Sequence, residues 1–162
     1  MSHFYPRAEY AEDQPMARTI LTTHVLSRGY QLGSATGLLY GGTRALFKRI
    51  PFTIPVMLRC AGLGGPIGAG TVGIGLMAQM WGRDDIEWKD RSWRLLNNHG
   101  QVTIDNWSET AAVLGAVAVA VSQSSGARLG GWRGLVGGAG MGSLIGIGSG
   151  MCANRVLPQT KE

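Results

Sequence analysis

The sequence predicts an all-α membrane protein, with four transmembrane helices packed as two hairpins and a short amphipathic helix in the loop between them. Three observations predict this fold. Glycine supplies 26 of the 162 residues and is mixed with Leu, Ile, Val, Met and Ala, without the three-residue period of collagen. Only 15% of the residues are charged. Four apolar stretches reach, or nearly reach, the roughly 17 to 25 residues that a helix needs to cross a bilayer.

The predicted transmembrane helices cover residues 29–47, 55–81, 107–123 and 131–156. The polar segments are an N-terminal tail, a central loop and a C-terminal tail, at residues 1–28, 82–106 and 157–162. Pro51 and Pro55 bracket the turn inside the first hairpin, and SQSSGARLGG is a turn signal inside the second. Residues 29–156 therefore form one four-helix membrane domain.

Small residues recur at every fourth position in all four apolar segments, and glycine does so without a break from Gly130 to Gly150. A glycine inside a helix costs about 1 kcal/mol relative to alanine. In lipid this cost is offset, because residues four apart share a helix face and small ones let two backbones approach closely. Since the stripe drifts by about 40° per step of four, the last helix should meet different neighbours at its two ends. The residues that we expect to pack the helices are Gly33, Gly37, Gly41, Gly65, Gly73, Ala112, Ala116, Gly134, Gly138, Gly142 and Gly146.

A soluble, glycine-rich nucleotide-binding protein is the alternative, since GLGGPIGAG resembles a phosphate-binding loop. Such a loop follows a strand and precedes an acidic residue about 20 positions further on. Here the glycine run continues through the whole segment instead of stopping at a turn. We therefore expect membrane lipid as the surroundings, and neither nucleic acid nor a small-molecule substrate as a partner.

The charges predict the orientation in the membrane. Both short turns fall on one side, which carries no acid and six basic residues: Arg44, Lys48, Arg49, Arg59, Arg128 and Arg133. Short basic loops stay on the cytoplasmic or matrix face, so both termini should lie on the opposite side. The other nine Lys and Arg residues lie on that opposite side, a contrary count, but they are spread over longer segments. At the N-terminus we expect neither a secretory signal nor a cleavable presequence, which is poor in acids.

Acid-then-base pairs four residues apart predict a short helix in the central loop: Asp85–Lys89, Glu87–Arg91 and Asp90–Arg94. Its apolar face should lie on the membrane surface or on a partner subunit, and the alternative is a solvated connector. All five tryptophans fall in this loop or at expected membrane interfaces, as in an aromatic belt. The residues that we expect to contact partners or the interface are Trp88, Trp93, Asp105 and Trp107.

Residues with catalytic or metal-binding chemistry are scattered along the chain. His3, His24 and His99 lie in the tail and the loop without metal-ligand spacing. Cys60 and Cys152 belong to opposite membrane faces, too far apart for a disulfide. The midsections of the four spans carry no ionisable residue, so we expect no buried acid and no polar transport path. We expect a non-catalytic protein with no cofactor; a bound phospholipid would fit its surroundings.

Two glycine-striped hairpins, basic short turns inside and a longer loop between the hairpins resemble the mitochondrial inner-membrane translocase family, the Tim-type proteins. The stretch DNWSETAAVLGA is similar to the family signature of an Arg, an Asp four residues later and a small-residue helix. Gln101 stands at the position of the Arg, and Val113 stands at that of a Gly. The matching residues are Asp105, Trp107, Ala112, Gly115 and Ala116.

The resemblance implies one of two functions, since the family comprises import channels and a Tim-like accessory subunit of respiratory complex I that transports nothing. Because no buried acid is expected, we favour the second. The chain would be a structural subunit of complex I (NADH:ubiquinone oxidoreductase) in the mitochondrial inner membrane, with both termini in the intermembrane space. Its partners would be core membrane-arm subunits of the complex. The alternatives are a subunit of an inner-membrane protein-import translocase and a cristae-shaping protein that self-assembles through its glycine stripes.

Overall fold

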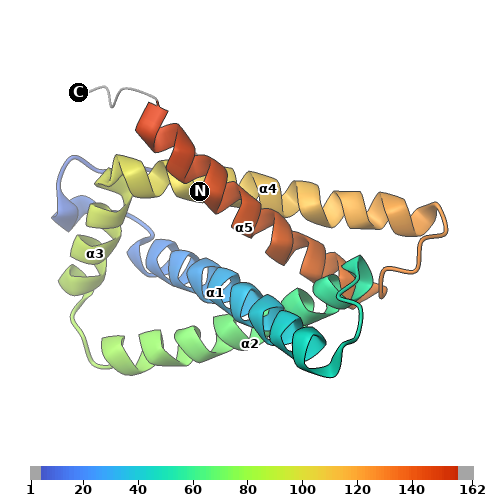
Figure 1. Cartoon of the computed structure of the whole chain (residues 1–162). Helices are drawn as coiled ribbons and strands as arrows, with labels where there is room; N and C mark the ends of the chain where they lie inside the picture. The colour runs from blue at the N-terminus through green and yellow to red at the C-terminus, as the bar shows by residue number, and fades with distance from the viewer. Residues whose placement is uncertain (1–4, 157–162) are drawn as a thin grey trace.

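The computed structural model describes residues 5–156, and helices dominate this part of the chain (Figure 1). The α-helices are α1 (Ala17–Lys48), α2 (Ile54–Met80), α3 (Asp85–Asn97), α4 (His99–Ser124) and α5 (Trp132–Val156). A short 3₁₀ helix, η2 (Ala11–Asp13), precedes them, and the described residues contain no strand. The predicted all-α class is therefore confirmed, and the central loop contains a helix, α3, as expected.

Within the described residues, α2 and α5 are long and apolar enough to cross a membrane, judged by length and composition alone. Core helices of soluble proteins pass the same test. Whether these helices lie in a membrane therefore depends on which of their faces are exposed and on whether the exposed side chains are apolar.

Two helices begin earlier than the sequence predicts. α1 begins at Ala17 rather than at residue 29, so much of the expected polar tail is helical. α4 begins at His99 rather than at residue 107, where the side chain of Asn98 caps it by accepting a backbone N–H bond. Hydropathy marks where a segment becomes apolar, whereas a helix continues for as long as its polar turns find partners. In α1 and α4 these polar turns bind each other.

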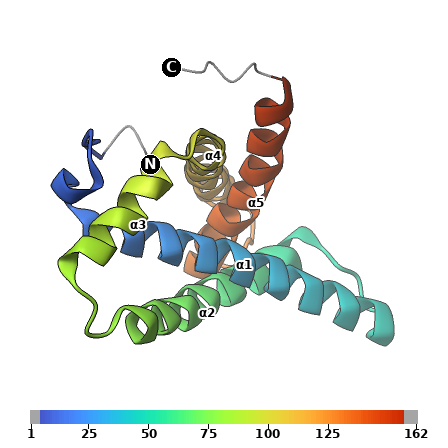
Figure 2. The same cartoon turned by 90° about the vertical axis from the view of Figure 1, so that its left-hand side faces the viewer.

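The helices form two antiparallel hairpins that lie against each other (Figures 1 and 2). α1 packs on α2, α4 packs on α5, and α5 also lies on α2 and α1. The two short turns, at residues 49–53 and 125–131, lie at one end of the molecule. The start of α1, the end of α5 and the whole of α3 lie at the other end, where α3 packs on α1 and η2.

α1 and α2 meet backbone to backbone. A Cβ atom built on Gly33 would come closer than 3.0 Å to the carbonyl oxygen of Gly64, and one built on Gly37 would do the same at Cys60. Real Cβ atoms essentially never make contacts this short, so any side chain at either position would push the helices apart. The spacing of the first hairpin therefore depends on glycine at these two positions.

α4 and α5 approach each other in the same way. A Cβ atom on Gly142 would come closer than 3.0 Å to the carbonyl oxygen of Ala111, and one on Gly138 would do so at Gly115. Gly134 lies instead against a carbonyl of the turn that precedes α5. Both hairpins are thus built on glycine contacts in their middle sections.

α5 meets two helices through adjacent faces. Its glycine stripe keeps facing α4 through the second half of the helix, so the second neighbour comes from the adjacent face and not from the expected drift of the stripe. Gly137 lies against the backbone of Leu58 in α2, and Gly62 of α2 lies against the carbonyl of Arg133. The next residue, Gly138, already faces α4. α5 is therefore the helix that joins the two hairpins through its backbone.

On α2 the closest backbone contacts with α1 lie beside the expected packing residue Gly65, which meets α1 through side chains. Gly64, rather than Gly65, faces the α1 backbone, while Gly65 lies against the ring of Tyr30. Gly73 meets only the end of the Leu26 side chain, at 2.9 Å from a built Cβ atom. Successive residues are about 100° apart on a helix, so a spacing of four cannot tell which of two neighbouring small-residue stripes faces the partner.

The other expected packing residues lie as follows. Those whose built Cβ atom would come closer than 3.0 Å to the backbone of another helix are Gly33, Gly37, Gly138, Gly142 and Gly146. A Cβ atom on Gly41 would lie 2.6 Å from the sulfur of Cys60, a side-chain contact. Ala112 and Ala116 are half-buried on α4.

Replacing Gly142 by leucine should destabilise the fold, whereas Gly148→Leu on the same helix should not. A side chain at Gly142 collides with the α4 backbone, whereas a Cβ atom at Gly148 meets nothing within 4 Å. The expected loss for Gly142→Leu is about 1–3 kcal/mol or more of the free energy of unfolding. The measurement is denaturant unfolding of the full chain in lipid bicelles. Equal stability of the two variants would contradict the packing argument.

Candidate functional site

A polar cluster joins α1 to α4 between the two hairpins. Three residues of α1 and three of α4 form it, each set at positions i, i+4 and i+7, which share one helix face. The members of the polar cluster are His24, Arg28, Gln31, Gln101, Asp105 and Ser108. Their regular spacing explains why all six side chains point into the same space between the helices.

The carboxylate of Asp105 is the centre of the cluster, and only 10% of its side chain is exposed. Arg28 donates to Oδ1 and forms an ion pair with it, and the side-chain amide of Gln101 donates to the same oxygen at 3.0 Å. Nδ1 of His24 lies 3.0 Å from Oδ2. An ionised carboxylate only accepts hydrogen bonds, so the proton of a neutral His24 ring lies on Nδ1.

A second set of hydrogen bonds closes the cluster. Arg28 donates to Oε1 of Gln31 at 2.8 Å, and the amide nitrogen of Gln31 donates to the Ser108 hydroxyl at 3.1 Å. The hydroxyl of Ser108 donates in turn to the backbone carbonyl of Asp105 at 3.0 Å. Gln31 and Ser108 are themselves buried. The bonds form a closed ring that begins and ends at Asp105.

A buried carboxylate is costly unless it is paired and hydrogen-bonded, and here it is both. Within residues 5–156, no buried side-chain nitrogen or oxygen lacks a hydrogen-bond partner. The cluster therefore stabilises one arrangement of the hairpins, because moving α1 away from α4 would leave the carboxylate buried and unpaired.

The expectation of no buried acid is wrong, since Asp105 is buried and His24 belongs to a helix rather than to a tail. The expected role of Asp105 was contact with a partner or the interface, yet its carboxylate binds groups of its own chain. The spacing of four and seven residues between the cluster members is visible in the sequence of both segments. The prediction failed because the charged members of both stretches were assigned to polar segments outside the apolar spans, and only Gln31 and Ser108 to the spans themselves.

Gln101 donates to Asp105 across one helical turn. The cation that balances Asp105 comes from Arg28 of another helix. The charge on Asp105 is thus balanced from α1 and not from its own helix.

The tryptophans expected at an interface make contacts within the chain. Nε1 of Trp93 donates to the carbonyl of Ala8 at 3.2 Å, and the guanidinium of Arg18 lies 5.7 Å from the centre of the Trp88 ring. Trp107 is 49% exposed. α3 is therefore docked on its own N-terminal segment and on α1, and it is not a solvated connector.

α3 also carries ion pairs along its exposed face. The expected pairs Lys89–Asp85 and Arg94–Asp90 form at 3.5 Å and 3.0 Å. Glu87 pairs with Arg83 at 3.2 Å, in place of its expected partner Arg91. Exposed pairs of this kind are worth about 0.2–1 kcal/mol each, so they support α3 without determining where it lies.

No group of three His, Cys, Asp or Glu residues in the described part of the chain is placed to hold a metal ion. Cys60 and Cys152 are both free. His3 lies outside the described residues. Comparison with protein-family models, with curated proteins and with solved structures finds no match for this chain.

Replacing Arg28 by leucine should lower the free energy of unfolding by about 3–5 kcal/mol, because Asp105 is left buried without its cation. The double variant Arg28→Leu/Asp105→Leu should recover much of this loss, since no charge is then buried alone. The measurement is equilibrium unfolding of the full chain in bicelles. The matched control is Asp90→Asn, which removes an exposed pair on α3 and should cost less than about 1 kcal/mol. Similar small losses for Arg28→Leu and Asp90→Asn would contradict a stabilising role for the cluster.

Proposed function

We propose that α1, α2, α4 and α5 all cross a membrane, held together by their glycine contacts. The support is the large apolar side chains that all four helices expose in their middle sections. These include Leu32, Leu39, Leu63, Ile67, Ile74, Val113, Leu114, Val117 and Ile145. Continuous apolar surface of this kind marks contact with lipid or with apolar partners. In lipid, where apolar surface gives no force between helices, close backbone packing holds them together.

α1 and α4 are less apolar than α2 and α5, and part of their polar content is the polar cluster. The side chains of the cluster are turned toward each other rather than toward the surroundings. The remaining length of both helices exposes apolar side chains, as α2 and α5 do. Polar residues inside a membrane are expected to face the interior of a helix bundle and to pair there.

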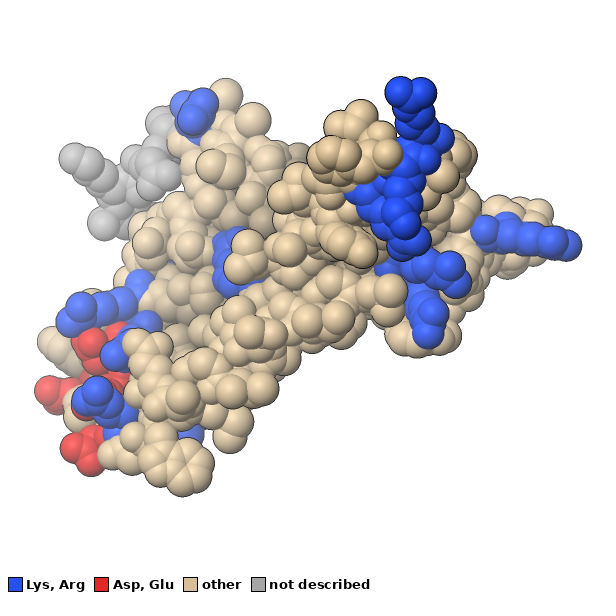
Figure 3. Space-filling model, turned by 60° about the horizontal axis from the view of Figure 1, so that its bottom comes forward, with Lys and Arg blue, Asp and Glu red and all other residues tan. Residues whose placement is uncertain are grey.

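The charges support one orientation. On the face that Figure 3 shows, the end that carries the short turns bears basic side chains and no acidic ones, whereas the opposite end carries acidic and basic side chains together. Positively charged short loops stay on the matrix side of the mitochondrial inner membrane. Both termini and α3 would then lie on the side of the intermembrane space.

The function we propose is that of a structural, non-catalytic accessory subunit of respiratory complex I in the mitochondrial inner membrane. The resemblance to Tim-type proteins suggests the class, and the closed polar cluster favours this function over transport. Asp105 is the buried acid that a transport path would use, and its two oxygens are occupied by Arg28, Gln101 and His24. A carboxylate bound in this way joins helices and offers no free group to a passing ion or peptide.

An import translocase subunit is the alternative, and the partial signature around Asp105 is the observation that favours it. Such a function requires the polar cluster to open toward a path across the bilayer. The hydrogen bonds of the cluster would then have to be exchanged for bonds to the cargo, at the cost of leaving Arg28 or Asp105 unpaired in between.

On a mild-detergent native gel of mitochondrial membranes, this chain should comigrate with the band that stains for NADH dehydrogenase activity. Its depletion should shrink or destabilise that complex, because an accessory subunit stabilises its neighbours. A much smaller band without the activity, together with crosslinks to a precursor arrested in transit, would contradict this function and support the translocase.

Labelling of single cysteines should report the orientation. In a chain carrying Cys60→Ala and Cys152→Ala, Arg91→Cys on α3 should react with a membrane-impermeant maleimide in intact mitoplasts. Ser125→Cys, in the short turn after α4, should react only after the membrane is permeabilised. The reverse pattern would overturn the orientation, and equal labelling of both would contradict four crossings.

A further inference from the structure

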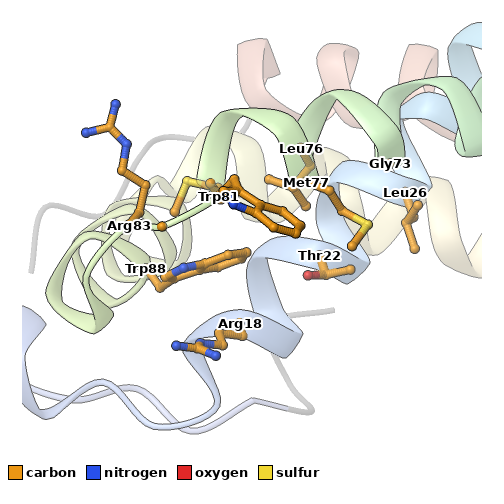
Figure 4. A pocket seen from close by; sticks show the side chains of 11 residues that line it. Arg18, Thr22, Leu26, Gly73, Leu76, Met77, Trp81, Arg83 and Trp88 are labelled. Carbon is orange, nitrogen blue, oxygen red and sulfur yellow. The ribbon is translucent and has the colours of Figure 1, made fainter.

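A groove lies between α1, α2 and α3, at the end of the molecule opposite the short turns (Figure 4). α1 and α2 touch at their glycines and separate toward this end, where α3 joins them (Figure 1). The resulting groove has a volume of about 700 Å³. This is within the range of about 300–1,000 Å³ that is usual for sites that bind small molecules.

Most residues that line the groove are apolar, and two of them are tryptophans. Trp81 and Trp88 lie on opposite sides of the opening, and Leu26 and Met77 lie further in, toward the middle of α1 and α2 (Figure 4). Trp81 and Met77 are 82% and 65% exposed, so none of residues 5–156 covers this side of the groove. The groove therefore continues into the exposed apolar surface of α1 and α2.

The charged residues that line the groove are both basic, Arg18 and Arg83. The guanidinium of Arg18 is held 5.7 Å from the centre of the Trp88 ring and 3.6 Å from the carboxylate of Asp85. Arg83 pairs with Glu87 at 3.2 Å. More than half of each arginine side chain is exposed. Exposed pairs are weak, so an anionic group at the mouth can compete with the two carboxylates for these cations.

We propose that this groove binds one phospholipid molecule, with its phosphodiester on Arg18 and an acyl chain between Trp81 and Trp88 and along Leu26 and Met77. The proposal rests on the membrane placement proposed above. Three features favour a lipid over a peptide or a soluble ligand. The groove opens onto the apolar surface of the helices, its indoles are suited to the membrane interface, and its cations lie at the polar end only. Each buried methylene of an acyl chain contributes about 0.8 kcal/mol, so the apolar part supplies most of the affinity.

Gly73 offers a way to fill the groove without disturbing the helix pair. It lines the groove, and a Cβ atom built on it meets only the terminal methyl of Leu26, at 2.9 Å. Because that methyl ends a flexible side chain, it can move aside for a leucine. Gly75 of the same helix faces open space, with nothing within 4 Å of a built Cβ atom. Gly73→Leu and Gly75→Leu thus form a matched pair that differs in where the new side chain points.

The test is native mass spectrometry of the purified, delipidated full chain titrated with phosphatidylglycerol and, separately, with diacylglycerol of the same acyl chains. The wild-type chain should saturate at one phosphatidylglycerol. Gly73→Leu should weaken binding of both lipids by about tenfold, while Gly75→Leu should bind like the wild type. Arg18→Gln should weaken phosphatidylglycerol alone, and Arg44→Gln, at the other end of the molecule, should change neither.

Equal binding by Gly73→Leu and Gly75→Leu, or uptake of phosphatidylglycerol that does not saturate, would overturn the groove as a lipid site. Equal effects of Arg18→Gln on the two lipids would overturn the role of the phosphodiester. The membrane placement is judged separately, by whether the chain stays in the pellet after carbonate extraction of membranes. A chain that stays in the pellet but binds no lipid contradicts this inference alone, and a chain released by carbonate contradicts the proposed function.

Discussion

The ion pair between Arg28 and Asp105 is the interaction that determines how α1 lies relative to α4, and together with the backbone contacts of α5 on α2 it sets the arrangement of the two hairpins. Within each hairpin the helices touch through glycine backbones, and α5 extends such contacts to α2. α1 and α4 are instead connected by long side chains that reach across the space between them. A carboxylate that is buried there must be paired. The stable arrangements of α1 and α4 are therefore those that bring Arg28 and His24 within hydrogen-bonding distance of Asp105. Glycine contacts determine how close the helices lie, and the polar cluster determines which turns of α1 and α4 lie opposite each other.

The groove is a geometric consequence of the glycine contacts. Helices that touch at small residues cross at an angle and separate beyond the crossing, so α1 and α2 leave a gap toward the end where α3 lies. α3 closes the end of this gap and brings Trp88 and its ion pairs to the mouth, while Trp81 follows the last residue of α2. The N-terminal segment holds α3 in place through Ala8 and Glu12, whose carbonyls accept bonds from Trp93 and Lys89. The gap that packing leaves open is therefore lined at its polar end by residues of a separate, docked element.

The parts of the structure that follow from local patterns could be predicted from the sequence. Apolar length marked the four long helices, turn residues marked their connections, and acid–base spacing marked α3. Helix starts were missed, because a mixed polar and apolar segment such as that from Ala17 to Arg28 is too polar to mark as a span, and it is held in the fold by contacts with a distant segment. The polar cluster was missed for the same reason: its two halves are more than seventy residues apart, so their spacing has meaning only once α1 and α4 are known to be neighbours. The backbone contact at Gly64, next to the expected Gly65, was missed because a spacing of four does not distinguish two neighbouring stripes of small residues.

The two kinds of interaction that hold this fold both depend on the surroundings. Glycine contacts give little in water, where burying apolar side chains would stabilise a helix pair far better, and many of the apolar side chains here point outward. In lipid those same side chains are solvated, and close backbone packing becomes the main source of attraction. The pair between Arg28 and Asp105 is likewise strengthened where water is scarce, because Coulomb attraction rises as the dielectric constant falls. The proposed role of this chain is to add stability to the membrane part of a larger complex. That role requires an exterior suited to lipid and an interior whose contacts are strongest in lipid.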